Sequence, residues 1–364
     1  MFLALRDLRF ATGRFALMGA VVALISLLLV MLSGLTAGLG GQNTGALDRL
    51  ASQGVQRLAF GSPSGQDPEA SFAQSGVTSA ELEAWRQADG VASADPLGVA
   101  QGRASTEEGI APVALIGVAP DGADAPSGLA EGEVVIGQEI AEQLHVGVGD
   151  TVALSGARVR VGAIEPTEYH SHTPVMWLSL TDWQEASHAG QDVVGTALAV
   201  RLQAGQGSAE SATDAADQAA GTVSTTVTDA YSALPAYSSE NGSLMTMQGF
   251  LYAIAALVTI AFLSIWTVQR TREIAVLKAL GGSTGWVLRD ALVQAGIVLS
   301  VGVLVGAAAA AGLGALASQA VPFTVDLATV LVPAAGMIAL GMLGATLAVV
   351  RAVRIDPLLA LGGN

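Results

Sequence analysis

The stretch FALMGAVVALISLLLVML, residues 15–32, decides the fold class of this chain. It is apolar apart from one Gly and one Ser, and no charged residue follows it until Asp48. Because one helix needs roughly 20 apolar residues to cross a bilayer, the stretch predicts a membrane-spanning helix that projects past the membrane. A cleaved signal peptide is the alternative. We favour the span, because the apolar run is too long for a signal peptide and no A-x-A-like cleavage site closes it.

Three further stretches have the length and composition of membrane spans. They occupy residues 249–268, 291–316 and 327–350. The whole chain is 51% hydrophobic and only 13% charged, whereas a soluble domain carries about 25% charged residues. Much of the chain is therefore expected to face lipid rather than water.

Charged residues are segregated along the chain. The segments 1–14, 270–290 and 351–364 hold nine basic and four acidic residues, whereas the remainder holds seven basic and 27 acidic ones. Basic loops stay on the cytoplasmic side of a membrane. We therefore expect a multi-pass protein of the plasma membrane with both termini in the cytoplasm and its acidic part outside. The acidic surface is most simply a solvated face that keeps this part soluble.

The region between the first and second spans has the pattern of a mixed α/β domain. Short β-type runs alternate with turn signals, and a short helix is expected at about 138–144. The expected strands are 55–60, 113–118, 134–136, 151–154, 159–164, 175–180 and 197–202.

These patterns predict a membrane α-helical protein with four transmembrane helices, one plus three, and an inserted mixed α/β extracytoplasmic domain. The expected segments are a cytoplasmic N-terminus at 1–14, transmembrane helix 1 at 15–39, the extracytoplasmic α/β domain at 40–244, transmembrane helix 2 at 245–269, a cytoplasmic loop at 270–290, transmembrane helix 3 at 291–316, an extracytoplasmic loop at 317–326, transmembrane helix 4 at 327–350 and a cytoplasmic C-terminus at 351–364.

The sequence lacks the motifs of a nucleotide site or of common hydrolases. Its single lysine, Lys278, does not stand in the G-x-x-x-x-G-K-[ST] pattern that a phosphate-binding loop requires. Neither H-E-x-x-H nor G-x-S-x-G occurs, and there is no cysteine. We therefore expect the chain not to be an enzyme, to have no cofactor of its own and to bind no nucleic acid.

Two histidines, His170 and His172, stand close in sequence. On a strand, His-x-His would point both rings to one face and offer two metal ligands. Two ligands are too few for a metal site, so we favour a surface loop.

The loop RTREIAVLKALGGS, residues 270–283, has the pattern of a short amphipathic helix ended by glycine. A generic juxtamembrane helix is one interpretation. The other, which the topology favours, is a coupling element that docks on an ATPase. Its candidate coupling residues are Glu273, Leu277, Lys278 and Leu280.

The segments REIAVLKALGGS (272–283) and RIDPLLALGG (354–363), with the one-plus-three layout, resemble the MacB/FtsX superfamily of ABC transporter permeases. The segment EVVIGQEIAEQLHVGVGDTVAL (133–154) also resembles the domain that this superfamily inserts after its first span. The resemblance covers nearly the whole chain. It implies a permease powered by a separate cytoplasmic ABC ATPase, which binds ATP and magnesium.

Within that superfamily the chain is most similar to the Hrt-type haem exporter permeases. This resemblance implies a homodimer with two ATPase copies, and haem as a substrate extruded from the lipid bilayer through mechanotransmission. Another hydrophobic substrate, a lipoprotein, or a signalling permease that transports nothing are the alternatives. The similar stretches are SGLTAGLGGQN (33–43), EYHSH (168–172), AYSSENGSLMTMQGFL (236–251) and the LGG at 361–363.

The start of the second span offers candidate haem contacts. In a helix, Tyr237, Glu240 and Met247 share one face beside apolar residues. Tyrosine and methionine occur as axial haem ligands, and a carboxylate is a hard oxygen donor for ferric iron, so Glu240 and Tyr237 are the candidate iron ligands. Anchoring at the membrane interface is the alternative for the Tyr and Met. A carboxylate at the edge of hydrocarbon is costly and favours a functional role.

Three residues elsewhere are further candidates for haem binding. Asn43 ends the extension of the first span and is expected to line the same site. Arg49 suits a haem propionate, or else pairs with one of the many local acids. Tyr169 matches the Tyr-x-His-Ser stretch of the haem exporters.

Overall fold

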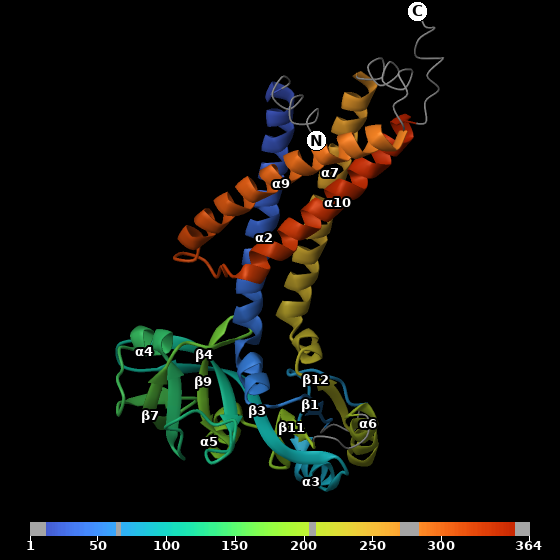
Figure 1. The fold of residues 1–364 in the computed structure, drawn as a ribbon. Helices are drawn as coiled ribbons and strands as arrows, with labels where there is room; N and C mark the ends of the chain where they lie inside the picture. The colour runs from blue at the N-terminus through green and yellow to red at the C-terminus, as the bar shows by residue number, and fades with distance from the viewer. Residues whose placement is uncertain (1–11, 63–66, 204–208, 270–283, 354–364) are drawn as a thin grey trace, which may run out of the picture. The chain divides into compact units, whose positions relative to one another are not determined.

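The computed structural model forms two compact units (Figure 1). One, here called the helical unit, comprises Met1–Leu39 and Asn241–Asn364, and the other, the α/β domain, comprises Gly40–Glu240. The residues that the structure describes are 12–62, 67–203, 209–269 and 284–353.

Four long helices confirm the expected spans and their one-plus-three order. Each contains a segment long and apolar enough to cross a membrane. In Figure 1 the first is blue and the other three run from gold to red. The helices are α2 (Thr12–Ser52), α7 (Pro235–Gln269), α9 (Thr284–Ala317) and α10 (Leu327–Val353).

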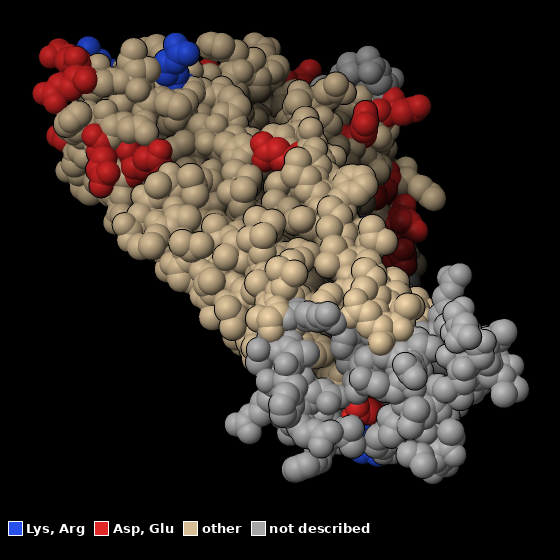
Figure 2. Space-filling model, turned by 90° about the horizontal axis from the view of Figure 1, so that it is seen from above, with Lys and Arg blue, Asp and Glu red and all other residues tan. Residues whose placement is uncertain are grey.

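Charged side chains are sparse on much of the visible surface in Figure 2, and those that are visible are mainly acidic. Large apolar side chains are exposed along all four helices, among them Leu17 on α2, Leu257 on α7, Leu304 on α9 and Leu347 on α10. Such side chains are favourable against lipid and unfavourable against water.

Small residues let α2 and α9 approach closely inside the helical unit. A Cβ added at Gly302 would lie 2.8 Å from Cγ1 of Val22, and one added at Gly306 would lie 2.2 Å from the carbonyl oxygen of Ala23. Ser26 donates its hydroxyl hydrogen across the same contact to the carbonyl of Val303, at 3.2 Å. Backbone contact of this kind stabilises helix pairs where lipid supplies no hydrophobic drive.

A second close contact joins α2 to the segment 318–326 between α9 and α10. Added Cβ atoms at Gly34 and Gly38 would lie 2.4 Å from the ring of Phe323 and 2.1 Å from the carbonyl oxygen of Pro322. The amide of Thr324 donates to the carbonyl of Gly34 at 3.1 Å. The two glycines therefore form the surface on which this segment rests.

A large mixed sheet organises the α/β domain. Its strand order is β12-β1-β11-β3-β4-β9-β5-β7-β6, with β8 paired to β9, and β2 and β10 form a separate pair. Most neighbours are antiparallel, whereas the pairs β4–β9 and β5–β7 are parallel. The strands are β1 (Arg57–Phe60), β2 (Val77–Thr78), β3 (Val91–Ser105), β4 (Ile110–Val118), β5 (Glu133–Gly137), β6 (Thr151–Leu154), β7 (Ala157–Glu165), β8 (Tyr169–His170), β9 (Thr173–Ser179), β10 (Val193–Gly195), β11 (Ala197–Leu202) and β12 (Val223–Thr226).

Four short helices and a 3-10 turn complete the domain. The second of them matches the helix expected at 138–144, and it ends on His145 in the left-handed conformation. The elements are α3 (Ser79–Gln87), α4 (Gln138–Leu144), α5 (Leu180–Ser187), α6 (Ala209–Ala220) and η1 (Asp229–Ala233).

The seven expected strands are all present, but the longest strand, β3, was missed. Its glycines and proline read as turn signals. In the fold the glycines are required by packing: a Cβ at Gly98 would lie 2.3 Å from the ring of Trp183, and one at Gly102 would lie 2.9 Å from Leu115. Tertiary contact therefore overrides local strand propensity here.

The last turns of α2 belong to the core of the α/β domain. Ala46, Leu47 and Leu50 are each 1% exposed and pack in one cluster with Leu58 and Phe60 of β1. A helix of 41 residues is about twice the length that a span requires. The expectation that the first helix continues beyond the membrane is confirmed.

We expect Gly38→Ala to destabilise the helical unit by about 2 kcal/mol, because the new Cβ overlaps the carbonyl oxygen of Pro322. Gly312→Ala is the matched control, since nothing lies within 4 Å of the Cβ that it adds. The thermal unfolding midpoint of the purified chain in one detergent measures the difference. Equal midpoints for the two variants would contradict the contact.

Candidate functional site

The first two turns of α7 present Tyr237 and Glu240. The helix begins with Pro235, a residue favoured at the first helical position because its missing N–H would have no helical partner there. The ring of Tyr237 packs edge-on against Tyr231, with centroids 5.6 Å apart, and joins the domain core. Glu240 follows one turn later and is partly exposed. The expected helix through Tyr237, Glu240 and Met247 is confirmed.

The hairpin between β8 and β9 brings a histidine to Glu240. Its two-residue turn is Ser171-His172, with φ angles of +50° and +61°. A two-residue hairpin in a type I′ turn needs positive φ at both positions, which Asn and Gly tolerate better than Ser and His. Strained turns of this kind are found where a side chain is needed for function.

The same turn is hydrogen-bonded to α2. The backbone amides of Ser171 and His172 donate to the carbonyls of Asn43 and Gln42 at 3.1 Å and 2.9 Å. A Cβ added at Gly45 would lie 3.2 Å from the carbonyl oxygen of Tyr169, so this glycine also permits the close approach. Helix and hairpin are thereby fixed in one register.

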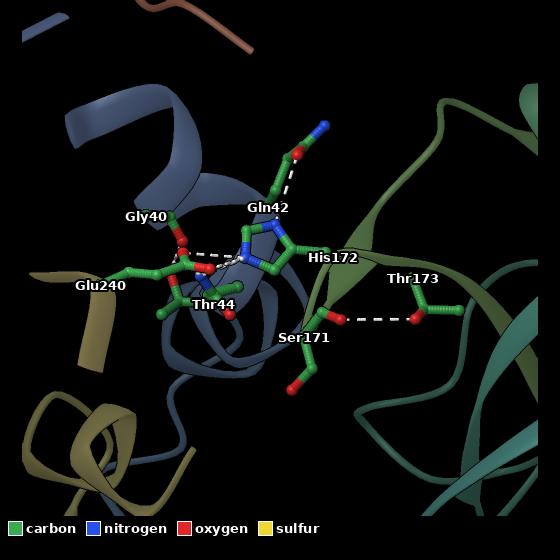
Figure 3. Close-up of polar contacts among 8 residues, drawn as sticks. Gly40, Gln42, Thr44, Ser171, His172, Thr173 and Glu240 are labelled. Carbon is green, nitrogen blue, oxygen red and sulfur yellow. Dashed lines mark hydrogen bonds and ion pairs between the residues drawn. The ribbon is translucent and has the colours of Figure 1, made fainter. Parts of the chain in front are cut away.

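The side chains of His172 and Glu240 point toward each other, as Figure 3 shows, and that of Asn43 contacts both. His172 Nε2 lies 2.9 Å and 3.0 Å from the two carboxylate oxygens of Glu240. The amide nitrogen of Asn43 donates to Oε2 of Glu240 at 3.2 Å and lies 3.0 Å from His172 Nε2. On the other side of the ring, Gln42 Oε1 is 3.4 Å from Nδ1. We call Asn43, His172 and Glu240 the polar triad.

Exposure in the polar triad is uneven. Asn43 is 1% exposed, whereas the side chains of His172 and Glu240 are 30% and 39% exposed. A ligand can therefore reach the carboxylate and the imidazole while the amide holds them from below. Carboxylate oxygen and imidazole nitrogen are both known donors to iron.

Arg49 is engaged inside the α/β domain. Its Nη1 donates to Glu165 Oε2 at 2.8 Å and to Glu168 Oε1 at 3.0 Å, and its guanidinium lies 5.1 Å from the ring centroid of Trp177. The indole N–H of Trp177 donates in turn to Glu168 at 3.1 Å. This network holds the end of α2 against the sheet. A contact between Arg49 and a propionate stays a prediction.

Tyr169 points its hydroxyl at an acid. It donates a hydrogen bond to Glu139 of α4. Burial, followed by this hydrogen bond and the charge of Glu139, raises the pKa of Tyr169 to about 12. The phenolate form that binds iron is therefore disfavoured here, and the structure brings Glu240 to His172 and Asn43 rather than to Tyr169.

Met247, a further predicted haem contact, is not a member of the triad. Met247 stands seven residues after Glu240 on α7, about two turns along, and is 54% exposed. The coupling residues Glu273, Leu277, Lys278 and Leu280 lie outside the described residues.

The geometry imagined for His-x-His is not found. His170 is 2% exposed and packs edge-on against Phe72, whereas His172 lies in the turn and meets Glu240. Among the described residues no group of three or more His, Asp or Glu side chains is arranged to hold a metal ion. Sequence reasoning missed His172 as the partner of Glu240, because 68 residues separate them. Its only signal was the resemblance at EYHSH.

Two protein families match the chain. Residues 16–219 match the MacB-like periplasmic core domain, and residues 245–357 match the C-terminal region of FtsX-like permeases. The chain belongs to the MacB/FtsX family of ABC-type permeases. Its members are transport subunits rather than enzymes, and with four apolar helices the chain is a multi-pass membrane protein.

Curated relatives carry the name hemin transport system permease protein HrtB. One from Staphylococcus epidermidis is 25% identical over 204 residues, which is 56% of this chain and 55% of the relative. One from Staphylococcus haemolyticus is 30% identical over 130 residues, or 36% of this chain and 37% of the relative. The match thus spans about half the length of these relatives or less.

Two solved structures are similar to part of the chain. The extracellular domain of the noncanonic ABC-type transporter YknZ from Gram-positive bacteria is 17% identical, with a TM-score of 0.36, and the match covers 47% of this chain and 98% of that domain. The periplasmic region of MacB from Actinobacillus actinomycetemcomitans is 12% identical, with a TM-score of 0.36, and the match covers 48% of this chain and 90% of that region.

The buried ring of His170 predicts a pH-dependent stability. Burial lowers the pKa of His170 from 6.5 to about 4. Below pH 6.5 the unfolded chain binds a proton that the folded chain refuses, so stability should fall by roughly 3 kcal/mol between pH 6.5 and 4 and should be fully present above pH 6.5. His170→Phe keeps a ring against Phe72 and should remove this component.

Denaturant unfolding of the full chain at pH 7 and pH 4.5, followed by tryptophan fluorescence, measures the effect. His188→Asn is the control. His188 is exposed, and its backbone has a left-handed conformation that Asn tolerates. The same acid sensitivity in His170→Phe as in the unaltered chain would refute the assignment.

Proposed function

We propose that this chain is the permease subunit of an ATP-driven pump that extrudes haem from the membrane. The observation that carries the proposal is the polar triad, an exposed carboxylate and imidazole held together where α7 begins its apolar run. Membership of the permease family supports the transport role, and the hemin-transport names of the relatives support haem as the substrate.

The residues that follow Glu240 suit a flat apolar substrate. Phe250 is 65% exposed on α7, with Leu251 and Tyr252 next to it in sequence, and Met245 and Met247 are exposed one turn earlier. Haem presents two apolar faces and an iron that needs axial donors. In this proposal the carboxylate and the imidazole of the triad offer donors to the iron, and a contact of Met247 with the porphyrin stays a prediction.

The triad defines the roles of its members. Asn43 and His172 hold the carboxylate of Glu240 by hydrogen bonds, so the oxygen donor is oriented before the substrate arrives. An iron that binds Glu240 replaces the hydrogen bond from His172. In this scheme Glu240 is the first iron ligand, and His172 is a positioning residue and the second candidate ligand. Tyr237, one turn before Glu240 on α7, contributes packing or ligation.

ATP hydrolysis belongs to a separate subunit in this proposal. The chain has no phosphate-binding loop, so two copies of a cytoplasmic ATPase supply the energy and bind the magnesium. Two copies of the permease form a homodimer with their termini in the cytoplasm. Closure of the ATPases moves the loop 270–283, and the movement passes through α7, α9 and α10 to the substrate site.

We expect Glu240→Ala to weaken haem binding at least about tenfold and to shift the Soret band, because an iron ligand is lost. Glu240→Gln should weaken binding similarly while it keeps an oxygen for His172 to donate to. Absorption titration of haem into the purified complex in nanodiscs measures both. Glu142→Gln removes an exposed acid elsewhere and is the control.

Two further variants separate the contributions of His172 and Tyr237. His172→Ala should weaken binding less than Glu240→Ala and keep the main band shape, and Tyr237→Phe isolates the loss of the hydroxyl. An unchanged haem spectrum in all of these variants would place the site elsewhere. No haem binding by the unaltered complex would favour a permease that signals without transport, or one that carries another substrate.

We expect Leu277→Asp to abolish transport while the ATPase still binds nucleotide, because it introduces a charge on the apolar face proposed to dock on the ATPase. Haem efflux from loaded vesicles and nucleotide binding measure the two properties. Arg272→Ala, on a polar face of the same segment, is the control. Full transport by Leu277→Asp would contradict the docking role of the segment. ATP hydrolysis by the purified permease alone would contradict the assignment of hydrolysis to a separate subunit.

A further inference from the structure

A cavity lies within the α/β domain beside the β8–β9 hairpin, whose His170 and Ser171 line it. Its volume is about 470 Å³, within the range of roughly 300 to 1,000 Å³ usual for small-molecule sites. Ala73, Gln101 and Gly190 line it and are exposed, so it opens to solvent. The lining also includes Phe72, Ser75, Gly76, Val99, Ala100, His170, Ser171, Trp183, Ser187, Ala189, Val193, Thr196, Leu234 and Pro235.

The lining of this cavity contains no Asp, Glu, Lys or Arg among the described residues. The absence is notable because the sequence has 31 acidic residues, most of them in this domain. A charged ligand would lose its hydration here without gaining an opposite charge. The lining therefore selects against ions, and against haem with its two carboxylates.

Buried polar atoms without partners gather in the cavity wall. Three buried side-chain atoms of this lining have no hydrogen-bond partner among the described residues: His170 Nδ1, Trp183 Nε1 and Ser187 Oγ. His170 and Trp183 are 2% and 3% exposed. An unsatisfied buried polar group is destabilising, so each of these atoms needs a partner, which a ligand or a water in the cavity can supply.

The walls are aromatic and firmly held. Phe72 packs edge-on against His170, with centroids 5.5 Å apart. The Trp183 ring lies against Gly98 and Gly117, where an added Cβ would come within 2.3 Å and 2.5 Å of its atoms. Aromatic side chains in a cavity lining favour an aromatic ligand, which can stack on them or meet them edge-on.

We propose that this cavity binds a small, uncharged aromatic molecule that carries a hydrogen-bonding oxygen. Such an oxygen accepts from the indole N–H of Trp183 and exchanges hydrogen bonds with the hydroxyl of Ser187 or the ring of His170. The site is distinct from the polar triad, because His170 and Ser171 line the cavity whereas the next residue, His172, meets Glu240. A molecule bound there contacts Ser171, which lies in the same β8–β9 turn as His172 of the triad.

Three fluorinated probes of one size test the charge and the site. 4-Fluorophenol is uncharged at pH 7, since phenols titrate near pH ~10, whereas 4-fluorobenzoate is an anion and 4-fluorobenzylamine a cation. The 19F line width of each probe is measured with the full chain in nanodiscs, and with chain-free nanodiscs to subtract uptake by lipid. We expect saturable binding of 4-fluorophenol alone.

Variants place the binding in the cavity. Ala100→Phe and, independently, Ala189→Trp fill the space from two different elements, and each should weaken 4-fluorophenol binding at least about tenfold. Ala130→Phe adds similar bulk at an exposed alanine outside the lining and should leave binding unchanged. Unfolding midpoints identify a filled variant that has lost its fold, in which case the other variant decides.

Any of three results would overturn the proposal. The first is the same line width with and without the chain, which would leave only water in the cavity. The second is full binding to both filled variants, and the third is equal binding of the anionic probe. None of these measurements involves haem or ATP, so they stand apart from the test of the permease function.

Discussion

The hydrogen bonds between the Ser171-His172 amides and the carbonyls of α2 are the contact on which the candidate site depends. They fix the β8–β9 hairpin against residues 42 and 43 of the first helix, whose final turns are buried in the domain core. With helix and hairpin in register, Asn43 and His172 reach Glu240 without further adjustment. The site is thus made from three segments of the chain that are far apart in sequence.

Much of the fold could be predicted from local patterns. The length of the apolar stretches predicts the four spans, and the short β-type runs between turn signals predict seven strands. The stretch GQEIAEQLHVG predicts α4 and the position of its C-terminus. Strand β3 was not predicted. Its Gly98 and Gly102 are needed to make room for the side chains of Trp183 and Leu115, which contact them only in the folded domain. A glycine can therefore indicate a turn or a close packing contact within a strand, and both look the same in the sequence.

The site was predicted less completely than the fold. Glu240 stood out because a carboxylate beside an apolar run is costly, but its partner His172 could not be deduced, since pairing across the hairpin and α7 follows from tertiary structure. Arg49 suits a propionate by chemistry, and the fold already supplies it with Glu165 and Glu168. The uncharged cavity could not be predicted from the sequence, because its lining residues Phe72, His170 and Trp183 come from separate segments of the chain.

The positive φ angles at Ser171 and His172 have a consequence for engineering. Asn-Gly suits such a turn better, so a search for heat-resistant variants would favour it there. That exchange would also delete the imidazole that meets Glu240. Melting temperature alone is therefore a misleading criterion for improving this protein, since the most attractive stabilising replacement in this hairpin removes a member of the polar triad.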